Sequence, residues 1–315
     1  MSYPLKVESR LRATYGLKTT QKIPRLSLRL LMKWVRLVFG YANSRQRTQD
    51  IYYLIKMFAQ SRIYNQETDS CSNITMPLQH IRLIHTSDTH LGDHLGHPSS
   101  KNALQKVVSE TILLGADFLL LAGDVFDNER ISDETVKFFL DEISKLDTPV
   151  ILLPGNHDLM HGTSIYKRGI FKNSPSNLFI FKEENGEIIE FDDQGIKFWG
   201  KAMSEHSPSF QPLSPLPHPE RNMWFIGMAH GHFEAIKTSS GRSSLIFPGE
   251  INKSPFNYIA LGHWDLYTDV SQGQNLAVYS GCPVTVGSKN GPGFVSLVDL
   301  DPEKGTLYEK WAIKS

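Results

Sequence analysis

Three short apolar runs in the middle of the chain each lead into a polar turn that contains glycine. They are IRLIH (81–85), DFLLLAG (117–123) and PVILLPG (149–155). Amphipathic helical patterns at 101–114 and 131–146 separate these runs. Apolar runs that alternate with helices are typical of buried parallel strands. We therefore expect a β-α-β-α-β unit that begins near residue 79.

The later half of the chain contains many short strand patterns and few long helices. We expect strands near 187–191, 195–199, 223–229, 257–261, 276–280 and 294–299, and a last one at 306–314. Residues 207–220 hold five prolines and are predicted to form a surface loop. The predicted fold class is α/β, with a second mixed sheet facing the first and helices flanking both.

The N-terminal segment has a different pattern. In the helical pattern 26–39, successive side chains lie about 100° apart, so the cationic residues fall in one narrow stripe on an otherwise apolar helix. The stripe consists of Arg25, Arg29, Lys33 and Arg36. A second helical pattern follows at 51–58. We expect a basic helical extension at 1–63, a polar linker at 64–78 and a main domain at 79–315.

Charge divides the chain at the same place. Residues 1–80 hold 13 Lys+Arg and 4 Asp+Glu, a net charge of +9. Residues 81–315 hold 20 Lys+Arg and 29 Asp+Glu, a net charge of −9, so the net charge of the whole chain is zero. The two cysteines, Cys71 and Cys282, form no CxxC pair, which excludes a disulfide framework or a cysteine zinc site and fits a reducing compartment. No apolar run is long enough to span a membrane, so we do not expect an integral membrane protein.

Polar residues gather where the predicted strands end. The first three strands lead into SDTH (87–90), GDVFD (123–127) and GNHD (155–158), and two later strands end in AHGH (229–232) and GHWD (262–265). Since the carboxyl ends of parallel strands meet in one crevice, these side chains should converge there. Carboxylates, imidazoles and an amide suit divalent metals, and Asp124 is the candidate for a carboxylate that bridges two cations.

This ordered set resembles the calcineurin-like metallophosphoesterases, whose pattern is DxH, GDxxD, GNH(D/E), H and GHxH. Within that superfamily, HTSDTHLG (85–92), YSGCP (279–283) and GFVSLVDL (293–300) are similar to the SbcD-like DNA-repair exonucleases. The resemblance implies a dinuclear metal centre, with Mn²⁺ the expected metal and Fe, Zn or Mg as alternatives. It also implies a role for each motif residue.

The first metal would be held by Asp88, His90 and Asp124, and the second by Asp124, Asn156, His230 and His263. His157 would be the acid that assists the leaving oxygen, while Asp127, Asp158 and His232 would orient ligands or contact substrate. Asp265 stands where the family has a histidine, and we expect it to complete the first metal site with an altered metal preference. Five further histidines are interpreted as solvated loop residues: His94, His97, His161, His206 and His218.

The resemblance implies a metal-dependent phosphodiester hydrolase, and a DNA nuclease is the expected function. Two alternatives stay open: a phosphatase or phosphodiesterase for a small molecule, nucleotide or phosphoprotein, and a non-catalytic binding scaffold. The acidic balance of 81–315 favours a small substrate, because a duplex-binding surface should be basic. The chain ends soon after 306–314, without the capping and partner-binding regions of the full-length nucleases, which argues against dependence on an SMC-like ATPase.

The extension has three open interpretations. It could pack on the catalytic domain or a partner, bind nucleic acid or a membrane surface through its cationic stripe, or act as a targeting peptide. Residues 1–49 contain one acid, Glu8, among 11 Lys+Arg, which is a composition typical of transit peptides. The expected location is cytoplasmic, and an organelle is the alternative if residues 1–49 act as a transit peptide.

Overall fold

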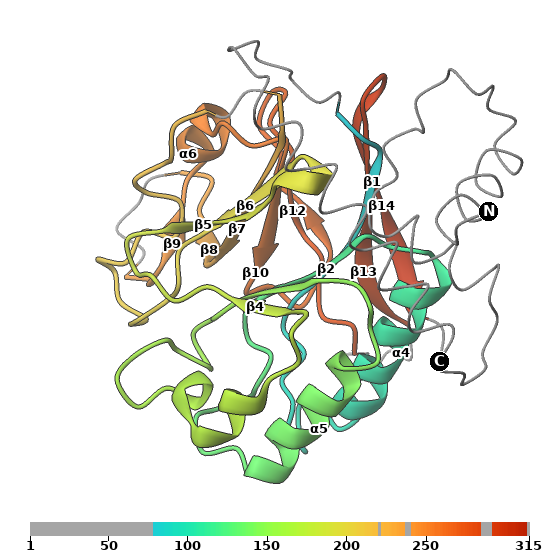
Figure 1. The fold of residues 1–315 in the computed structure, drawn as a ribbon. Helices are drawn as coiled ribbons and strands as arrows, with labels where there is room; N and C mark the ends of the chain where they lie inside the picture. Colours follow the sequence, from blue (N-terminus) through green and yellow to red (C-terminus); the bar gives the residue numbers. More distant parts are fainter. Residues whose placement is uncertain (1–77, 220–221, 237–240, 285–291, 314–315) are drawn as a thin grey trace, which may run out of the picture. The chain divides into compact units, whose positions relative to one another are not determined.

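Two six-stranded β-sheets with flanking helices form the main part of the described chain (Figure 1). The computed structural model describes residues 78–219, 222–236, 241–284 and 292–313. The predicted extension at 1–63, its cationic stripe and nearly all of the predicted linker lie outside these residues.

The first sheet contains the predicted β-α-β-α-β unit. Its strand order is β14-β13-β1-β2-β3-β4, and its strands are β1 (Ile81–Thr86), β2 (Phe118–Ala122), β3 (Val150–Leu153), β4 (Leu178–Ile180), β13 (Gly293–Asp301) and β14 (Gly305–Ile313). Strands β1 to β4 run parallel to one another. Every residue of β2 and β3 is buried, as expected for strands covered on both faces.

The assignment of residues 294–299 to the second sheet is wrong. These residues lie in β13, which pairs antiparallel with β1 in the first sheet, with Ile84 opposite Leu297. β14 then pairs with β13 and forms the outer edge. A strand pattern specifies which face is buried but does not specify the partner strand, so the local sequence held no information about this long-range pairing.

The second sheet faces the first and is mixed, as predicted. Its order is β11-β12-β10-β7-β6-β5, with β5 (Glu187–Phe191), β6 (Ile196–Gly200), β7 (Trp224–His230), β10 (Tyr258–Gly262), β11 (Thr268–Asp269) and β12 (Ala277–Tyr279). β8 (His232–Phe233) and β9 (Leu245–Ile246) form a separate short pair. β6, β7, β10 and β12 are parallel, so β7 and β10 end at the same edge of their sheet.

The helices are α4 (Ser100–Leu113), α5 (Asp133–Ile143), α6 (Pro248–Lys253) and the 3₁₀ turns η1 (Ile165–Lys167), η2 (Gly169–Asn173) and η3 (Asp192–Gln194). The two long helices, α4 and α5, pack through apolar faces with helical spacing. α5 begins after Ser132, whose side chain accepts a hydrogen bond from Thr135 N and so caps the helix. Figure 1 shows α4 and α5 together beside the first sheet. None of the helices in the described ranges is long and apolar enough to cross a membrane.

Aromatic side chains fill the space between the two sheets. Phe118 of β2 lies 4.9 Å from both Phe191 of β5 and Phe198 of β6, measured between ring centroids. β2 also contacts β7 and β10 directly. This packing fixes the carboxyl ends of β1, β2 and β3 opposite those of β7 and β10, and the polar turns meet there.

Candidate metal centre

The turns after β1, β2 and β10 hold their polar residues in an unusual backbone conformation. The φ angles of Asp88, His90, Asp124 and His263 are 53°, 48°, 52° and 107°. Residues other than glycine rarely adopt positive φ angles of this size. Backbone bonds from Asp88 N to Gly123 O and from His90 N to Asp124 O, both 3.0 Å, hold the first two turns together. Such strain persists only where the surrounding structure imposes it, and it is concentrated at functional sites.

Two glycines let the turns approach one another closely. A Cβ atom on Gly123 would lie 2.0 Å from Nδ1 of His230, and one on Gly155 would lie 2.2 Å from Oδ1 of Asp124. Both separations are far below van der Waals contact, so a side chain at either position would displace a residue of the predicted metal site.

The predicted ligands come together in two groups that share one carboxylate. Asp88, His90 and Asp124 offer ligand atoms within 4.8 Å of one another, and so do Asp124, His230 and His263. Asn156 joins the second group: its Oδ1 lies 3.0 Å from His230 Nε2 and 2.8 Å from His263 Nδ1. The position of Asp124 in both groups is the one expected of a bridging ligand.

Burial and the attraction between His230 and its neighbouring carboxylates control the charges in this cluster. Asp88 is buried, which raises its pKa to about 7 even though His230 opposes the shift. Burial lowers the pKa of His230, but the neighbouring Asp124 outweighs this and raises it to about 9. Asp124 itself has a lowered pKa, because His230 outweighs the effect of burial on that carboxyl. Without a cation, a proton on His230 offsets the buried carboxylates.

The donor set fits a pair of divalent cations. Two buried carboxylates share one cluster, and a buried charge is stable only when it is paired or binds a metal. The Nδ1 of His90 and the Nε2 of His97 are also buried without a hydrogen-bond partner among the described residues. The cavity over the cluster has a volume of about 280 Å³, and it is lined by Asp88, His90, Asp93, His97, Asp124, Asp127, Asn156, His157, His263 and Asp265.

His157 stands at the border between this cavity and a second pocket. Its backbone N donates to Asp124 Oδ1 at 2.8 Å, and its Nδ1 lies 2.6 Å from the carbonyl oxygen of Asp127. Because a carbonyl oxygen only accepts hydrogen bonds, Nδ1 carries the proton and Nε2 remains available to a substrate. The side chain is 42% exposed, so substrate can reach it. Asp127 therefore orients His157 through its main chain.

Asp158 lies beneath the site and does not line either pocket. One carboxylate oxygen accepts from Val125 N, Phe126 N and the Tyr166 hydroxyl, at 2.8, 3.1 and 2.6 Å, and the other accepts from Gly155 N at 2.7 Å. These bonds tie the turn after β2 to the turn after β3. Burial raises the pKa of Asp158 to about 6.

Two other predicted residues occupy the rim. His232 accepts a hydrogen bond from Trp264 Nε1 at 3.0 Å, and its other nitrogen contacts Arg242, so it lies in a neighbouring polar group rather than in the cavity lining. Asp265 does line the cavity, with its side chain 44% exposed. It is grouped with His90 and His97 rather than with Asp88 and Asp124.

The interpretation of His97 as a solvated loop residue is wrong, because the residue is 9% exposed and lines the cavity. Asp93, four residues earlier, was not predicted as a site residue and also lines it. The loop that carries both has no regular pattern, so nothing in the local sequence indicated its path. The one available signal was the presence of two extra metal-binding residue types directly after the first motif.

The fold and the two donor groups agree with the comparison with known protein families. The family model described as calcineurin-like phosphoesterase matches residues 81–264, more than half of the chain, and the chain belongs to this family. The family depends on a pair of metal ions, in agreement with the donor groups described above.

Known relatives match only part of the chain. A DNA double-strand break repair protein Mre11 from Nanoarchaeum equitans is 32% identical over 80 residues, 23% of this chain and 22% of that protein. An Mre11 from Methanosarcina acetivorans is 30% identical over 91 residues, 26% of this chain and 15% of that protein. The matched region thus spans less than a quarter of either relative. One solved crystal structure covers 74% of this chain and 100% of its own at 13% identity, with a TM-score of 0.50, and supports the fold.

Proposed function

We propose that this protein is a metal-dependent nuclease that hydrolyses phosphodiester bonds in DNA. The similarity to two Mre11 proteins supports this substrate class, as does the resemblance of its motifs to SbcD-like exonucleases. The observation that carries the proposal is the shape of the site. The cavity over the metal cluster adjoins a second pocket of about 470 Å³, and the two share Asp127, Asn156 and His157.

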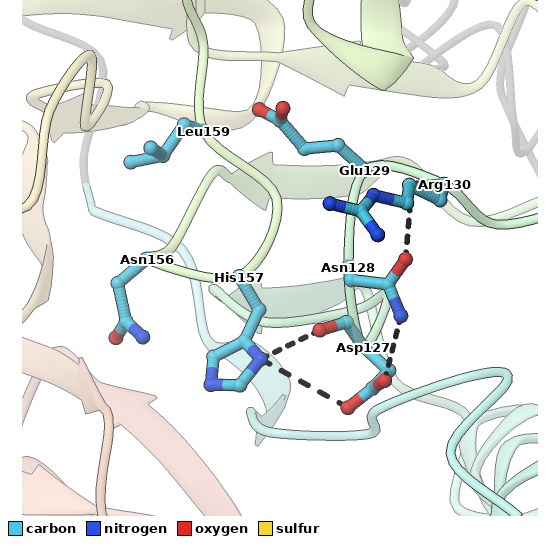
Figure 2. A pocket seen from close by; sticks show the side chains of 7 residues that line it. All are labelled: Asp127, Asn128, Glu129, Arg130, Asn156, His157 and Leu159. Carbon is cyan, nitrogen blue, oxygen red and sulfur yellow. Dashed lines mark hydrogen bonds and ion pairs between the residues drawn. The ribbon is translucent and has the colours of Figure 1, made fainter.

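The second pocket has room for a nucleotide that flanks the phosphate under attack. Figure 2 shows Asn156 and His157 at one side of it and the loop of Asn128, Glu129 and Arg130 at the other. Leu159 adds an apolar side chain to the lining. A guanidinium group suits a neighbouring phosphate, and an apolar side chain suits a base or sugar. This second pocket is named the flanking pocket below.

In the proposed reaction the protein groups have separate tasks. Asp88, His90 and Asp124 would hold the first cation, and Asp124, Asn156, His230 and His263 the second. Two bound cations would supply the positive charge that polarises the phosphate and activates water. His157 would act in its doubly protonated form: Nδ1 donates to the carbonyl of Asp127, which keeps the ring in position, and Nε2 carries the second proton and passes it to the leaving oxygen.

A phosphatase or phosphodiesterase that acts on a small molecule is the second candidate. It is favoured by the excess of acidic residues in 81–315, with 29 Asp+Glu against 20 Lys+Arg, since this charge repels a polyanion. Comparing kcat/KM for DNA oligonucleotides, a chromogenic phosphodiester and a phosphomonoester separates the two. The nuclease predicts that DNA is preferred to both small substrates, and preference for a small substrate would favour the second candidate. Turnover of none of them would favour the non-catalytic scaffold.

Arg130 provides a sharper test of the flanking pocket. Arg130→Ala should weaken DNA binding, and it should lower the slope of log affinity against log salt by about 0.7–0.9 if one phosphate contact is lost. Hydrolysis of the small chromogenic diester should not change, because that substrate does not reach the pocket. Lys137→Ala, on the exposed face of α5 where Lys137 pairs with Asp141, is the matched control. Equal effects of the two substitutions would contradict a role for Arg130.

A further inference from the structure

His97 is held firmly against the predicted first metal site. Its ring stacks on the ring of His90, with 4.5 Å between centroids and 26° between planes. Its Nδ1 lies 2.8 Å from Oδ2 of Asp93. Asp93 is fixed in turn, because its Oδ1 accepts from the backbone N of Leu95 and of Gly96, both at 2.9 Å. The loop after β1 therefore determines where the imidazole points.

The bond to Asp93 determines which nitrogen of His97 can bind a ligand. An ionised carboxylate only accepts hydrogen bonds, so Nδ1 carries the proton and the lone pair of the neutral ring is on Nε2. A carboxylate that holds the far nitrogen of an imidazole is the usual support of a metal-binding histidine. Asp93 and His97 have this arrangement.

The surroundings of Nε2 are those of a metal ligand. The atom is buried and has no hydrogen-bond partner in the described ranges. Oδ1 of Asp265 lies 3.8 Å away, too far for a hydrogen bond. Two atoms that bind one ion at about 2.1 Å are roughly 3–4 Å apart, depending on the angle between them. His90, His97 and Asp265 also offer ligand atoms within 4.8 Å of one another.

We propose that Nε2 of His97 is a ligand of the first metal beside His90 and Asp265, and that Asp93 is its positioning residue. His90 belongs both to this group and to the group of Asp88 and Asp124, which completes the site. His97 then supplies the imidazole that the family pattern places at the position of Asp265. The imidazole has thus moved from the turn after β10 to the loop after β1, while Asp265 offers a carboxylate from the turn after β10. This inference rests on the first metal site of the proposed function.

Metal binding measured without any substrate tests the proposal. We expect His97→Ala to weaken binding of one Mn²⁺ at least tenfold, with the second ion retained, as followed by calorimetric titration and metal analysis of the dialysed protein. His94→Ala is the matched control, since His94 belongs to the same loop and is exposed. If His97→Ala binds both ions as tightly as the wild type does, His97 is not a ligand.

Two further variants guard against a purely structural effect. His97→Phe keeps a ring that can stack on His90 but lacks both nitrogens, so it should lose the same ion even if the alanine variant folds poorly. The double variant His97→Ala/Asp265→His should regain the ion, because it restores the imidazole at the family position. Failure of the double variant to regain it would contradict the exchange of roles. A failure to cleave DNA would not affect these results, so the two proposals are tested separately.

Discussion

At the scale of single residues, His157 contributes through two separable groups. Its backbone N donates to Asp124 and helps to hold that carboxylate, whereas its imidazole is held by the carbonyl of Asp127 and is open to substrate. Removing the side chain leaves the backbone contact in place. The proton transfer can therefore be removed without dismantling the proposed metal centre.

We expect His157→Ala to keep both metals and to lose about 10²–10⁴-fold in rate, the range typical of general acid–base catalysis. Asp124→Asn should lose metal and activity together, because Asp124 belongs to both ligand groups. Measuring metal content and turnover of a chromogenic phosphodiester for both variants distinguishes an acid from a metal ligand. Loss of metal from His157→Ala would make His157 a ligand rather than an acid.

The charges of Asp88 and His230 predict that metal affinity rises with pH. In the metal-free protein the pKa of His230 is raised from 6.5 to about 9, so it is protonated at neutral pH, and the pKa of Asp88 is raised to about 7. A cation must displace these protons, so affinity should increase as the pH rises from 6 to 9 and fall as it drops. Calorimetric titration with Mn²⁺ in two buffers of different ionisation enthalpy counts the protons released. An affinity for Mn²⁺ that does not change with pH would contradict the displacement of protons from His230 and Asp88.

The convergence of the predicted ligands could be expected from sequence, because they end or follow strands with a clear apolar pattern. Asp88, Asp124 and Asn156 come within a few residues of β1, β2 and β3, and parallel neighbours bring their ends together. His97 and Asp93 lie in an irregular loop. Their burial depends on the path of that loop over His90, which no local pattern specifies.

At the scale of elements, the site depends on how closely the turns after β2 and β3 approach. Asp158 bonds to backbone groups of both turns, and Gly155 leaves room for the carboxylate of Asp124. The strands of this unit were predictable because their runs are short, apolar and separated by helices. The placement of β13 beside β1 could not be predicted, because it depends on a pairing between residues more than 200 positions apart.

Gly155→Ala should disturb the metal centre more than the fold. The new Cβ would lie 2.2 Å from Asp124 Oδ1 and 2.6 Å from Asp124 N, so the turn after β2 must shift, at a cost of about 1–3 kcal/mol for overpacking. Gly162→Ala is the control, because a Cβ there meets no atom within 4 Å. Thermal melting and Mn²⁺ stoichiometry measured for both variants provide the comparison. Wild-type metal binding by the Gly155 variant would contradict this account.

At the scale of the whole molecule, the charge of the chain is divided between an N-terminal segment of +9 and a remainder of −9. The remainder contains every proposed metal ligand and would repel a polyanion by itself. A basic segment joined to it would offset that repulsion. If the sequence prediction of a helix at 26–39 holds, the cationic stripe of Arg25, Arg29, Lys33 and Arg36 is the part of this segment best suited to bind phosphates.

Deleting residues 1–75 should weaken DNA binding at low salt and leave hydrolysis of a small chromogenic phosphodiester nearly intact. Each phosphate contact that is lost should reduce the slope of log affinity against log salt by about 0.7–0.9. Binding measured over a series of salt concentrations gives the slope, and the small substrate reports whether the shortened protein is folded. An unchanged slope in an active truncated protein would leave packing or targeting as the role of the segment.

One titration tests most directly whether the proposed metal centre cleaves DNA. The full-length protein is stripped of metal with chelator and then titrated with Mn²⁺, while cleavage of end-labelled single- and double-stranded DNA is followed, with Asp124→Asn in parallel. We predict no cleavage by the stripped protein, cleavage that appears as Mn²⁺ binds and exceeds that with Mg²⁺, and none by the variant. Full cleavage by the extensively chelated protein, or by Asp124→Asn, would contradict this proposal.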